Sequence, residues 1–337
     1  MPSERIYAVT MGDPAGIGGD IALAAWVQRT LVKLPCFFLL DDPDRLARLS
    51  KMLALDVPIV EISEPQEAPK YFEKALPVLP CNLQQSAIPG KLDARNAPAV
   101  LRSLEKAVAM AISGQVSGVV TNPIHKKTLY GAGFAHPGHT EYLAEVTGRT
   151  PVMMLSCPGL RVVPVTIHIP VSAVAVKLNR DTIVSLGQIL AASLTQDFGI
   201  ASPRIGVAAL NPHGGEGGAL GREELDIIAP AVDILRDQVI DAKGPYPADT
   251  LFHAEARTRY DAVLCMYHDQ ALIPLKTIDF DNGVNTTLGL PIVRTSPDHG
   301  TALDIAGTGM ANPASFIAAL KQADLIAKNR TRNLAAT

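Results

Sequence analysis

The stretch Ile6-Tyr-Ala-Val-Thr-Met-Gly-Asp-Pro-Ala-Gly-Ile-Gly18 joins a run of apolar residues to a glycine-rich turn. Residues 6–11 have the length and composition of a buried strand, and a helical pattern follows over residues 19–29. Apolar runs of strand length alternate with helical patterns in the same way almost to the end of the chain. This alternation predicts βα units and a largely parallel sheet.

The remaining elements are assigned by working outward from this first unit. Strands are expected at residues 36–40, 116–120, 152–156, 162–168, 205–210 and 262–267. Helices are expected at residues 43–53, 97–112, 140–146, 181–198, 222–239 and 313–328. Residues 57–98 hold seven prolines and no clear period, which indicates short edge strands and loops. A chain of 337 residues exceeds the usual size of a single core, and no linker is visible, so two interwoven lobes are expected.

Composition argues against several classes of protein. Hydrophobic residues make up 47% of the chain and charged residues 19%, which is typical of a well-buried globular protein. The formal net charge is −3 and no dense Lys/Arg run occurs, which argues against nucleic acid or an anionic membrane as the main partner. The four cysteines lie far apart, and the N-terminus lacks the apolar segment of a secretion signal. A soluble, cytoplasmic protein with reduced thiols is expected.

Three histidines stand at the ends of three predicted strands: His168, His213 and His268. Ligands bind at the carboxyl ends of strands in an α/β sheet, and three imidazoles there can hold a divalent metal with one position left for substrate. Each histidine taken alone is better explained as a hydrogen-bonded strand-end residue. The context that all three share favours a metal site, and therefore an enzyme.

Glycine-rich segments mark further candidate binding loops. Residues 12–18 open a helix, where backbone amides favour anions, but they lack the G-x-G-x-x-G spacing, so a Rossmann site is weakly supported and an ordinary βα turn explains them equally well. Residues 137–141 open the next helix, where Thr140 is a routine cap and His139 is a candidate to hold a phosphate or carboxylate. Residues 211–218 place four glycines around a His and a Glu, a costly loop unless the backbone bends around something.

The segment from residue 266 to residue 309 holds the densest set of polar groups. Lys276 and Arg294 lie there in apolar, glycine-rich surroundings, and arginine suits bidentate contact with a phosphate. A surface cation is the usual role of either residue alone. Their surroundings favour a clamp for a phosphorylated substrate.

Seven motifs, in this order, resemble those of the 4-hydroxythreonine-4-phosphate dehydrogenase (PdxA) family. They are Met11-Gly-Asp-Pro-Ala-Gly-Ile-Gly18, Thr121-Asn-Pro-Ile-His-Lys126, Gly138-His-Thr-Glu141, Asn211-Pro-His-Gly-Gly-Glu-Gly217, Tyr267-His-Asp-Gln270, Gly283-Val-Asn-Thr-Thr-Leu-Gly-Leu-Pro291 and Arg294-Thr-Ser-Pro-Asp-His-Gly-Thr-Ala302. The resemblance covers nearly the whole chain. Gly19-Asp20 departs from the Pro-Glu of many members at a helix start.

The resemblance implies a fold and an assembly. The fold is that of the isocitrate and isopropylmalate dehydrogenases: two interwoven α/β/α lobes with the active site in the cleft between them. Residues 1–130 and 286–337 would form the cofactor-side lobe, and residues 131–285 the lobe with the dimerisation surface and the metal site. The implied assembly is a homodimer whose active site is completed across the interface, with no nucleic acid or membrane partner.

The resemblance also implies roles for individual residues. The ligands of a divalent metal (Zn, Mg or Co) would be His168, His213 and His268, with His268 given by the partner subunit. The substrate contacts would be His139, Thr140, Lys276, Asn285 and Arg294. The contacts of the cofactor, NAD or NADP, would be Gly12, Asp13, Gly16, His299, Gly300, Thr301 and Ala302. The candidate catalytic groups are Lys276, Asp249 and Asp269, with the general base left open.

The implied reaction is the NAD(P)-linked oxidation of 4-phosphooxy-L-threonine to 2-amino-3-oxo-4-phosphooxybutanoate. A divalent metal would lower the pKa of the substrate hydroxyl, and the hydride would pass to the nicotinamide. The product would lose carbon dioxide to give 3-amino-2-oxopropyl phosphate for pyridoxal 5'-phosphate synthesis. Relatives that oxidise D-threonate or D-erythronate 4-phosphate, or cyclic diol dicarboxylates, are alternatives. A metal-dependent hydrolase and a phosphate acyltransferase of related fold are alternatives from other classes.

Overall fold

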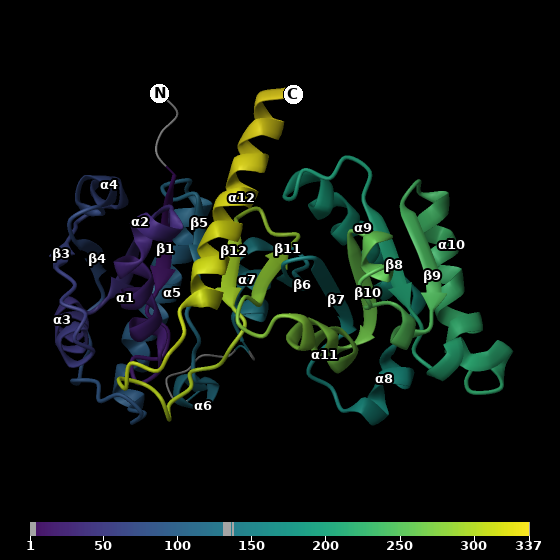
Figure 1. Ribbon diagram of the computed structural model, residues 1–337, viewed down its shortest axis with the longest axis horizontal. Helices are drawn as coiled ribbons and strands as arrows, with labels where there is room; N and C mark the ends of the chain where they lie inside the picture. The colour runs from purple at the N-terminus through teal and green to yellow at the C-terminus, as the bar shows by residue number, and fades with distance from the viewer. Residues whose placement is uncertain (1–4, 131–135, 137, 337) are drawn as a thin grey trace. The chain divides into compact units, whose positions relative to one another are not determined.

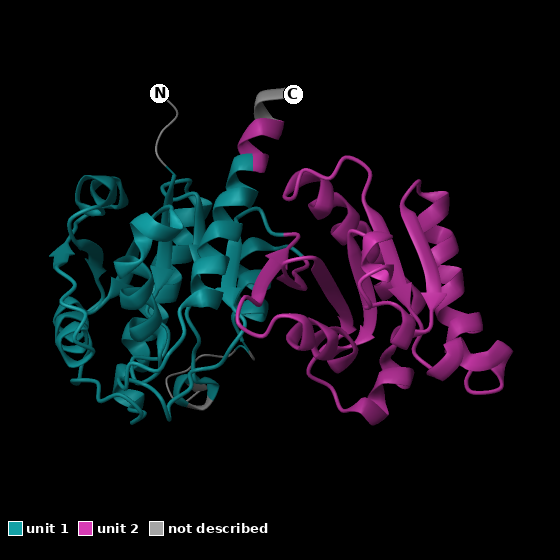
Figure 2. Ribbon diagram, in the orientation of Figure 1, with its two compact units in different colours: residues 1–149, 290–328 teal, residues 150–289, 329–337 magenta. Residues whose placement is uncertain are grey.

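The computed structural model describes residues 5–130, 136 and 138–336 of the chain. It has the predicted mixed α/β fold and divides into two compact units. Unit 1 comprises Met1–Arg149 and Leu290–Lys328, and unit 2 comprises Thr150–Gly289 and Asn329–Thr337 (Figure 2). Each unit is therefore assembled from two separate stretches of the chain. The lobe boundary predicted after residue 130 adjoins residues 131–135, which lie outside the described residues, as does Pro137 of the predicted helix start.

Unit 1 is built on parallel strands (Figure 1). In spatial order these are β3 (Ile59–Glu61), β4 (Leu76–Pro80), β2 (Cys36–Asp41), β1 (Ile6–Thr10), β5 (Gly118–Val120) and β12 (Arg294–Pro297). The central strands β1 and β2 are buried along their whole length, as expected of parallel strands covered on both faces. The carboxyl end of β1 leads into the first glycine-rich turn.

Helices surround the strands of unit 1. The longer ones are α1 (Gly18–Val27), α3 (Pro43–Met52), α5 (Ala97–Ile112), α7 (His139–Thr147) and the first part of α12 (Ala314–Ala336). Shorter ones are α2 (Arg29–Val32), η1 (Pro65–Glu67), α4 (Ala68–Tyr71), η2 (Ala94–Asn96) and α6 (Lys126–Tyr130). Helix α3 begins where Asp42 accepts a hydrogen bond from the Arg45 amide at 2.8 Å, with Pro43 at its first position. The helix predicted over residues 97–112 is confirmed as α5.

Unit 2 is built on strands in the order β11 (Val284–Leu288), β6 (Val152–Cys157), β7 (Leu160–Thr166), β10 (Ala262–Tyr267), β8 (Arg204–Ala208) and β9 (Asp241–Tyr246). Strand β6 runs antiparallel to both of its neighbours, whereas β7, β10, β8 and β9 run parallel. The carboxyl ends of β7, β10 and β8 therefore meet at one edge.

The helices of unit 2 are α8 (Val171–Lys177), α9 (Arg180–Gln196), α10 (Ala229–Asp237) and α11 (His268–Ile278), with the turns η3 (Pro212–Gly218), η4 (Glu224–Ile228), η5 (Ala248–Thr250) and η6 (Ala256–Thr258). Val163, Val207 and Leu264 from three adjacent strands pack with Leu190 of α9 and Leu235 of α10 in one buried core. None of the helices in the described part of the chain is long and apolar enough to span a membrane.

The observed elements differ from the predicted ones mainly beyond residue 160. The strand predicted for residues 162–168 ends at Thr166, and the strand predicted for residues 205–210 ends at Ala208, so the polar residues that follow lie in turns. The helix predicted over residues 222–239 is split into the π-turn η4 and helix α10. The sequence patterns did not predict the elements α8, β9, α11, β11 and β12.

Candidate active site

The three strand-end histidines follow adjacent parallel strands of unit 2. His168 lies two residues beyond β7, and His268 is the first residue of α11, directly after β10. His213 lies in the turn η3, beyond the end of β8. Because β10 pairs with both β7 and β8, the topology directs all three toward the same edge of the sheet.

His168 and His268 form a pair. Their ring centroids are 6.1 Å apart, and both residues line a cavity of about 150 Å³ together with Thr166 and Tyr267. Nδ1 of His268 lies 2.7 Å from Oδ1 of Asp269, so the carboxylate orients the ring and leaves Nε2 for coordination. Two neighbouring imidazoles, one of them oriented by a carboxylate, fit a divalent transition metal.

His213 stands apart from this pair. Its side chain is 68% exposed, and its Nδ1 lies 2.7 Å from Oε1 of Glu216. The hydrogen bond and the charge of Glu216 raise the pKa of His213, and the charge of Asp249 raises it further. Within the described residues, no group of three or more His, Cys, Asp or Glu side chains is placed to hold a metal. A single chain therefore brings together two of the three predicted ligands.

The turn that carries His213 has an unusual backbone. Residues 213–217 all have positive φ, from +43° at Glu216 to +78° at Gly215, so the chain is left-handed over five residues. His213 (φ +52°) and His168 (φ +55°) both adopt this conformation, which costs a non-glycine residue on the order of 1–2 kcal/mol. Strain of this kind is concentrated at functional sites.

Glu224 fixes the start of this turn. Its Oε1 accepts hydrogen bonds from the backbone amides of Leu210 at 2.8 Å and Asn211 at 2.7 Å, and its Oε2 accepts one from the Asn211 side chain. Burial raises the pKa of the Glu224 carboxyl, but the hydrogen bonds outweigh burial and lower its pKa overall. Sequence analysis missed this residue, for which an acidic pair directly after a glycine-rich loop was the available signal.

Two of the candidate catalytic groups face one cavity. Asp249 and Asp269 line a cavity of about 380 Å³ along α11, whose apolar wall includes Ile273. Lys276 lies further along α11, with Nζ 5.0 Å from the ring centroid of Phe280, and is not among the residues that line this cavity. The structure therefore places the two carboxylates at one cavity, whose lining does not include Lys276.

Arg294 and His139 form a basic pair in unit 1. Arg294 is 4% exposed, and its Nη2 donates to Oγ1 of Thr121 at 2.6 Å and lies 3.5 Å from Nδ1 of His139. Burial lowers the pKa of Arg294 to about 10. Burial, together with the charges of Arg294 and Lys126, lowers the pKa of His139 to about 3, so this imidazole is neutral at pH 7. Thr140 follows in the first turn of α7. Sequence analysis missed Thr121, although it opens one of the quoted motifs.

Two predicted substrate residues hold buried polar atoms that have no hydrogen-bond partner among the described residues. In unit 1 the atom is Nε2 of His139, and in unit 2 it is Oδ1 of Asn285, in strand β11. An unpartnered buried polar atom costs free energy, so such atoms are rare in folded proteins. Each residue therefore offers, within its own unit, an atom that suits a ligand.

The two predicted cofactor segments meet in unit 1. The backbone amide of Ile17 donates to the carbonyl of Thr301 at 3.0 Å, and a Cβ at Gly16 would lie 2.8 Å from that oxygen. Gly12 has φ +68°, and a Cβ there would lie 2.7 Å from Cβ of Asn122. Close packing thus requires both glycines. The other candidates in the second segment are His299, Gly300 and Ala302.

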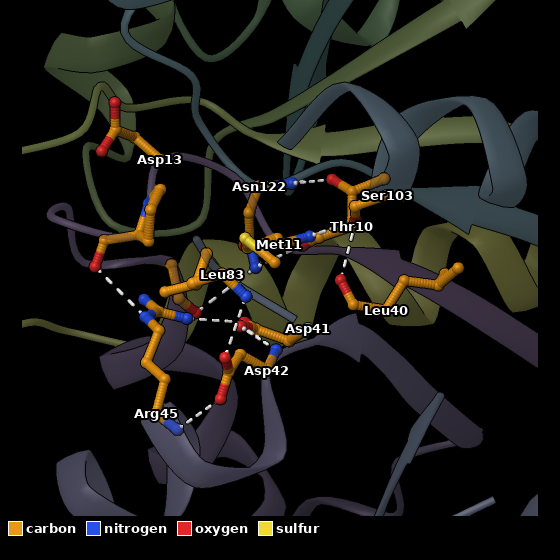
Figure 3. A network of polar contacts seen from close by, with 12 residues as sticks. Thr10, Met11, Asp13, Leu40, Asp41, Asp42, Arg45, Leu83, Ser103 and Asn122 are labelled. Carbon is orange, nitrogen blue, oxygen red and sulfur yellow. Dashed lines mark hydrogen bonds and ion pairs between the residues drawn. The ribbon is translucent and has the colours of Figure 1, made fainter. Parts of the chain in front are cut away.

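A buried polar network supports the first glycine-rich turn (Figure 3). Oδ1 of Asp13 accepts a hydrogen bond from the Ala15 amide at 3.0 Å, and Nε of Arg45 donates to the carbonyl of Pro14 at 3.2 Å. Arg45 is anchored by Asp41, with Nη1 2.6 Å from Oδ2. Sequence analysis missed Arg45, because a basic residue in an amphipathic helix normally faces solvent.

Paired histidines at strand ends and a buried arginine beside a neutral histidine define an enzyme of the α/β class. The family model for "Pyridoxal phosphate biosynthetic protein PdxA" matches residues 33–323. The chain is 53% identical to a 4-hydroxythreonine-4-phosphate dehydrogenase of Bradyrhizobium diazoefficiens, over 98% of this chain and 99% of that protein. It is 52% identical to one of Caulobacter vibrioides, over 97% and 99%. The crystal structure of the enzyme of that name from Klebsiella pneumoniae superposes with a TM-score of 0.85 at 37% identity, over 96% of this chain and 99% of that chain. The chain belongs to the 4-hydroxythreonine-4-phosphate dehydrogenase (PdxA) family of oxidoreductases.

Proposed function

We propose that this protein catalyses the metal-dependent, NAD(P)-linked oxidation of 4-phosphooxy-L-threonine to 2-amino-3-oxo-4-phosphooxybutanoate. This product is a β-keto acid, so it loses carbon dioxide to give 3-amino-2-oxopropyl phosphate, a precursor of pyridoxal 5'-phosphate. The observation that carries the proposal is the near-full-length similarity to 4-hydroxythreonine-4-phosphate dehydrogenases. The unpartnered buried atoms of His139 and Asn285 support it, because the motifs alone had assigned both residues to the substrate.

Arg294 is the proposed anchor of the substrate phosphate, with His139 and Thr140 beside it. Its guanidinium keeps its charge at pH 7 and is able to form two parallel hydrogen bonds to a phosphate. His139 contributes a hydrogen bond rather than a charge, because its pKa is held at about 3. Asn285 and Lys276 are the proposed contacts of the remaining polar groups of the substrate.

His168, His213 and His268 are the proposed ligands of the divalent metal, which is Zn, Mg or Co. These residues would hold the ion next to the substrate hydroxyl, and the chemistry that it would supply there is a lower pKa of that hydroxyl. Asp249 and Asp269 are the proposed acceptors of the hydroxyl proton, with Lys276 as the third candidate. The glycine-rich turn at residues 12–16 and the loop at residues 299–302 would hold a nicotinamide cofactor, which supplies the hydride acceptor.

A homodimer with a shared site completes the proposal. Helix α11 begins with His268 and leaves Ile273 65% exposed, and Phe280, two residues beyond the end of this helix, is 69% exposed. Apolar side chains beside an incomplete ligand set suit a second copy of the chain. The resemblance assigns His268 to the partner subunit. His168 and His268 lie close together in one chain, which favours a different assignment of the ligands to the two subunits. In that assignment His168 and His268 come from one subunit and His213 comes from the other.

Hybrid dimers test the shared site. Co-expression of a His213→Ala chain with a His268→Ala chain leaves one intact site per hybrid if these residues come from different chains. About half of the dimers are hybrids in a random mixture, so activity should reach about a quarter of wild type. A mixture of His168→Ala with His268→Ala regains activity only if that second pair comes from different chains. If neither mixture regains activity although hybrids form, one chain supplies all three ligands and the shared site is wrong.

A substrate panel tests the reaction. Purified protein is supplied with metal and, separately, with NAD or NADP, and reduced nicotinamide is followed by its absorbance. We expect turnover to be fastest with 4-phosphooxy-L-threonine, to stop on chelation and to return with added metal. Faster oxidation of D-threonate or D-erythronate 4-phosphate would move the protein to another branch of the family. Hydrolysis without reduction of nicotinamide would contradict the dehydrogenase.

A further inference from the structure

A second cavity lies in unit 2 at the other end of the same strands. It has a volume of about 220 Å³, and its lining includes the first residues of β7, β8 and β10, which are Leu160, Arg204 and Ala262. Because these strands are parallel, their amino ends point away from the carboxyl ends that lead to His168 and His268. The cavity is therefore separate from the histidine pair.

Three arginines and one carboxylate line this cavity: Arg161, Arg204, Arg257 and Asp261. Asp261 is paired with Arg204, since its Oδ2 accepts from Nε at 3.1 Å and its Oδ1 accepts from Nη2 at 3.0 Å. The hydrogen bond from Arg204 holds the pKa of Asp261 below its usual value, so this carboxylate is charged at neutral pH. One positive charge of the three is thus balanced.

In the described residues, the other two guanidinium groups have only backbone acceptors. Nη1 of Arg161 donates to the carbonyl of Asp261 at 3.2 Å, and its guanidinium lies 5.0 Å from the ring centroid of Phe198. Burial lowers the pKa of Arg161, although the negative charge of Asp261 acts to raise it. Nη1 of Arg257 lies 3.5 Å from the carbonyl of Gly159, and its Nε is buried without a hydrogen-bond partner. The cavity therefore holds positive charge in excess and one donor without an acceptor.

We propose that this cavity binds a phosphate dianion, either free or carried by a small phosphate monoester. A charge of about −2 matches the two unbalanced guanidinium groups. The planar fork of arginine suits phosphate oxygens, and one of these would supply the acceptor that Nε of Arg257 lacks. Tyr260 lines the same space and provides an apolar wall for the carbon skeleton of an ester. The proposal does not depend on the dehydrogenase activity.

Two substitutions address the cavity, and a third is a matched control. Arg257→Gln removes the guanidinium that carries the unpartnered Nε. The only hydrogen bond that it removes among the described residues is the long one to the carbonyl of Gly159, so the fold should persist. Thr258→Glu keeps all three arginines and places a carboxylate at an exposed lining position, where it competes with an anion. Arg259→Gln removes a neighbouring exposed arginine that pairs with Glu255 and lies outside the lining.

Titration calorimetry with inorganic phosphate and with glycerol 3-phosphate measures binding to the metal-loaded, full-length protein. The proposed active site also takes phosphate, so wild type should show two classes of site. We expect one class to weaken by at least about tenfold in Arg257→Gln and Thr258→Glu, and to stay unchanged in Arg259→Gln. Tighter binding of glycerol 3-phosphate at this class would identify an ester as the ligand, and equal binding would identify free phosphate.

The competing explanation is a structural clamp, in which the arginines only hold the amino ends of β7, β8 and β10 together. In that case wild type would show a single class of phosphate site, and Arg257→Gln would destabilise the protein without changing the titration. This result would overturn the proposal, as would titrations that superimpose for all four proteins. Because binding rather than turnover is measured, failure here is distinct from failure of the proposed reaction.

Discussion

At the scale of single residues, the left-handed turn at residues 213–217 makes the strictest demand on side chains. A Cβ added at Gly215 (φ +78°) would lie 2.6 Å from Oε2 of Glu224 and 2.9 Å from the carbonyl of Gly221. Gly217 (φ +63°) has no described atom within 4 Å of an added Cβ. The two glycines share a backbone conformation and differ in the space around them.

Alanine at these two positions should therefore separate strain from collision. Gly217→Ala should lower the free energy of unfolding by about 1 kcal/mol, from left-handed strain alone. Gly215→Ala should lower it by about 2–4 kcal/mol, because the new methyl group also collides with Glu224. Chemical denaturation measures both values. Equal losses would show that Glu224 moves aside freely and does not anchor the turn.

The neutral state of His139 predicts a dependence of stability on pH. Its pKa is about 3 in the folded chain against an ordinary value of 6.5. Between these two pH values the unfolded chain binds a proton at His139 that the folded chain does not bind. The free energy of unfolding is therefore highest above pH 6.5 and falls as the pH is lowered. From pH 7 to pH 5 the free energy of unfolding should fall by on the order of 2 kcal/mol because of His139. The substitution His139→Gln should abolish this contribution to the pH dependence. Parallel pH profiles for wild type and variant would contradict a His139 that is neutral in the folded chain.

At the scale of elements, sequence patterns identify the helices and strands that bury apolar side chains. They miss the helices and strands that bury polar side chains. The apolar face of α5 and the apolar run of β1 were enough to predict both elements. Strand β12 is Arg-Thr-Ser-Pro and is wholly buried, with Oγ1 of Thr295 donating to the carbonyl of Ala319 at 2.9 Å. Helix α11 contains Pro274, which normally argues against a helix interior. Tertiary partners, not local pattern, determine these two elements.

The candidate site was predictable to the same extent. The ends of apolar runs located His168, His213 and His268 near the ends of strands. The separation of His213 from the other two was not predictable, because it arises from a left-handed turn. That turn depends on the buried carboxylate of Glu224, whose contacts leave no periodic signal in the sequence.

Helix α12 is tied to the start of β1 through one carboxylate. Oδ1 of Asp324 accepts hydrogen bonds from Nε of Arg5 at 2.8 Å and from the hydroxyl of Tyr7 at 3.0 Å. Burial raises the pKa of Asp324, but hydrogen bonds from Arg5, Lys328 and Tyr7 outweigh it and lower the pKa overall. A lowered folded pKa means that the stabilisation is present above the unfolded pKa and is lost as the pH falls through the folded value.

Asp324→Asn should accordingly destabilise the protein by about 1–2 kcal/mol at pH 7 and by less near pH 3. Asp233→Asn, at an exposed carboxylate of α10, is the matched control and should change stability by less than about 0.5 kcal/mol. Denaturant titrations at both pH values measure the two effects. A loss that is the same at pH 3 and pH 7 would show that shape rather than charge matters at Asp324.

At the scale of the whole molecule, the exposed side chain of Ile273 on α11 predicts where two chains meet. Ile273→Lys should convert the proposed homodimer into monomers and abolish activity, because a buried lysine opposes association and the proposed shared site would remain incomplete. Leu31→Lys changes a residue that is 82% exposed on α2 of unit 1 and should leave both properties unchanged. Light scattering coupled to gel filtration measures the mass. An active dimer of Ile273→Lys would place the interface elsewhere.

The loop that carries His213 also has a stereochemical consequence. Its residues 213–217 trace the mirror image of a helical turn, a hand that L-amino acids avoid and D-amino acids prefer. D-alanine introduced at the exposed Gly217 by chemical ligation should therefore stabilise the protein by about 0.4–1 kcal/mol, since it restricts the unfolded chain without strain. Relative to the protein with glycine, the melting temperature should rise with D-alanine at position 217 and fall with L-alanine. Ribosomal synthesis supplies only L-amino acids, so at Gly217 the handedness of the polymer, rather than any neighbouring side chain, limits which residues can replace glycine.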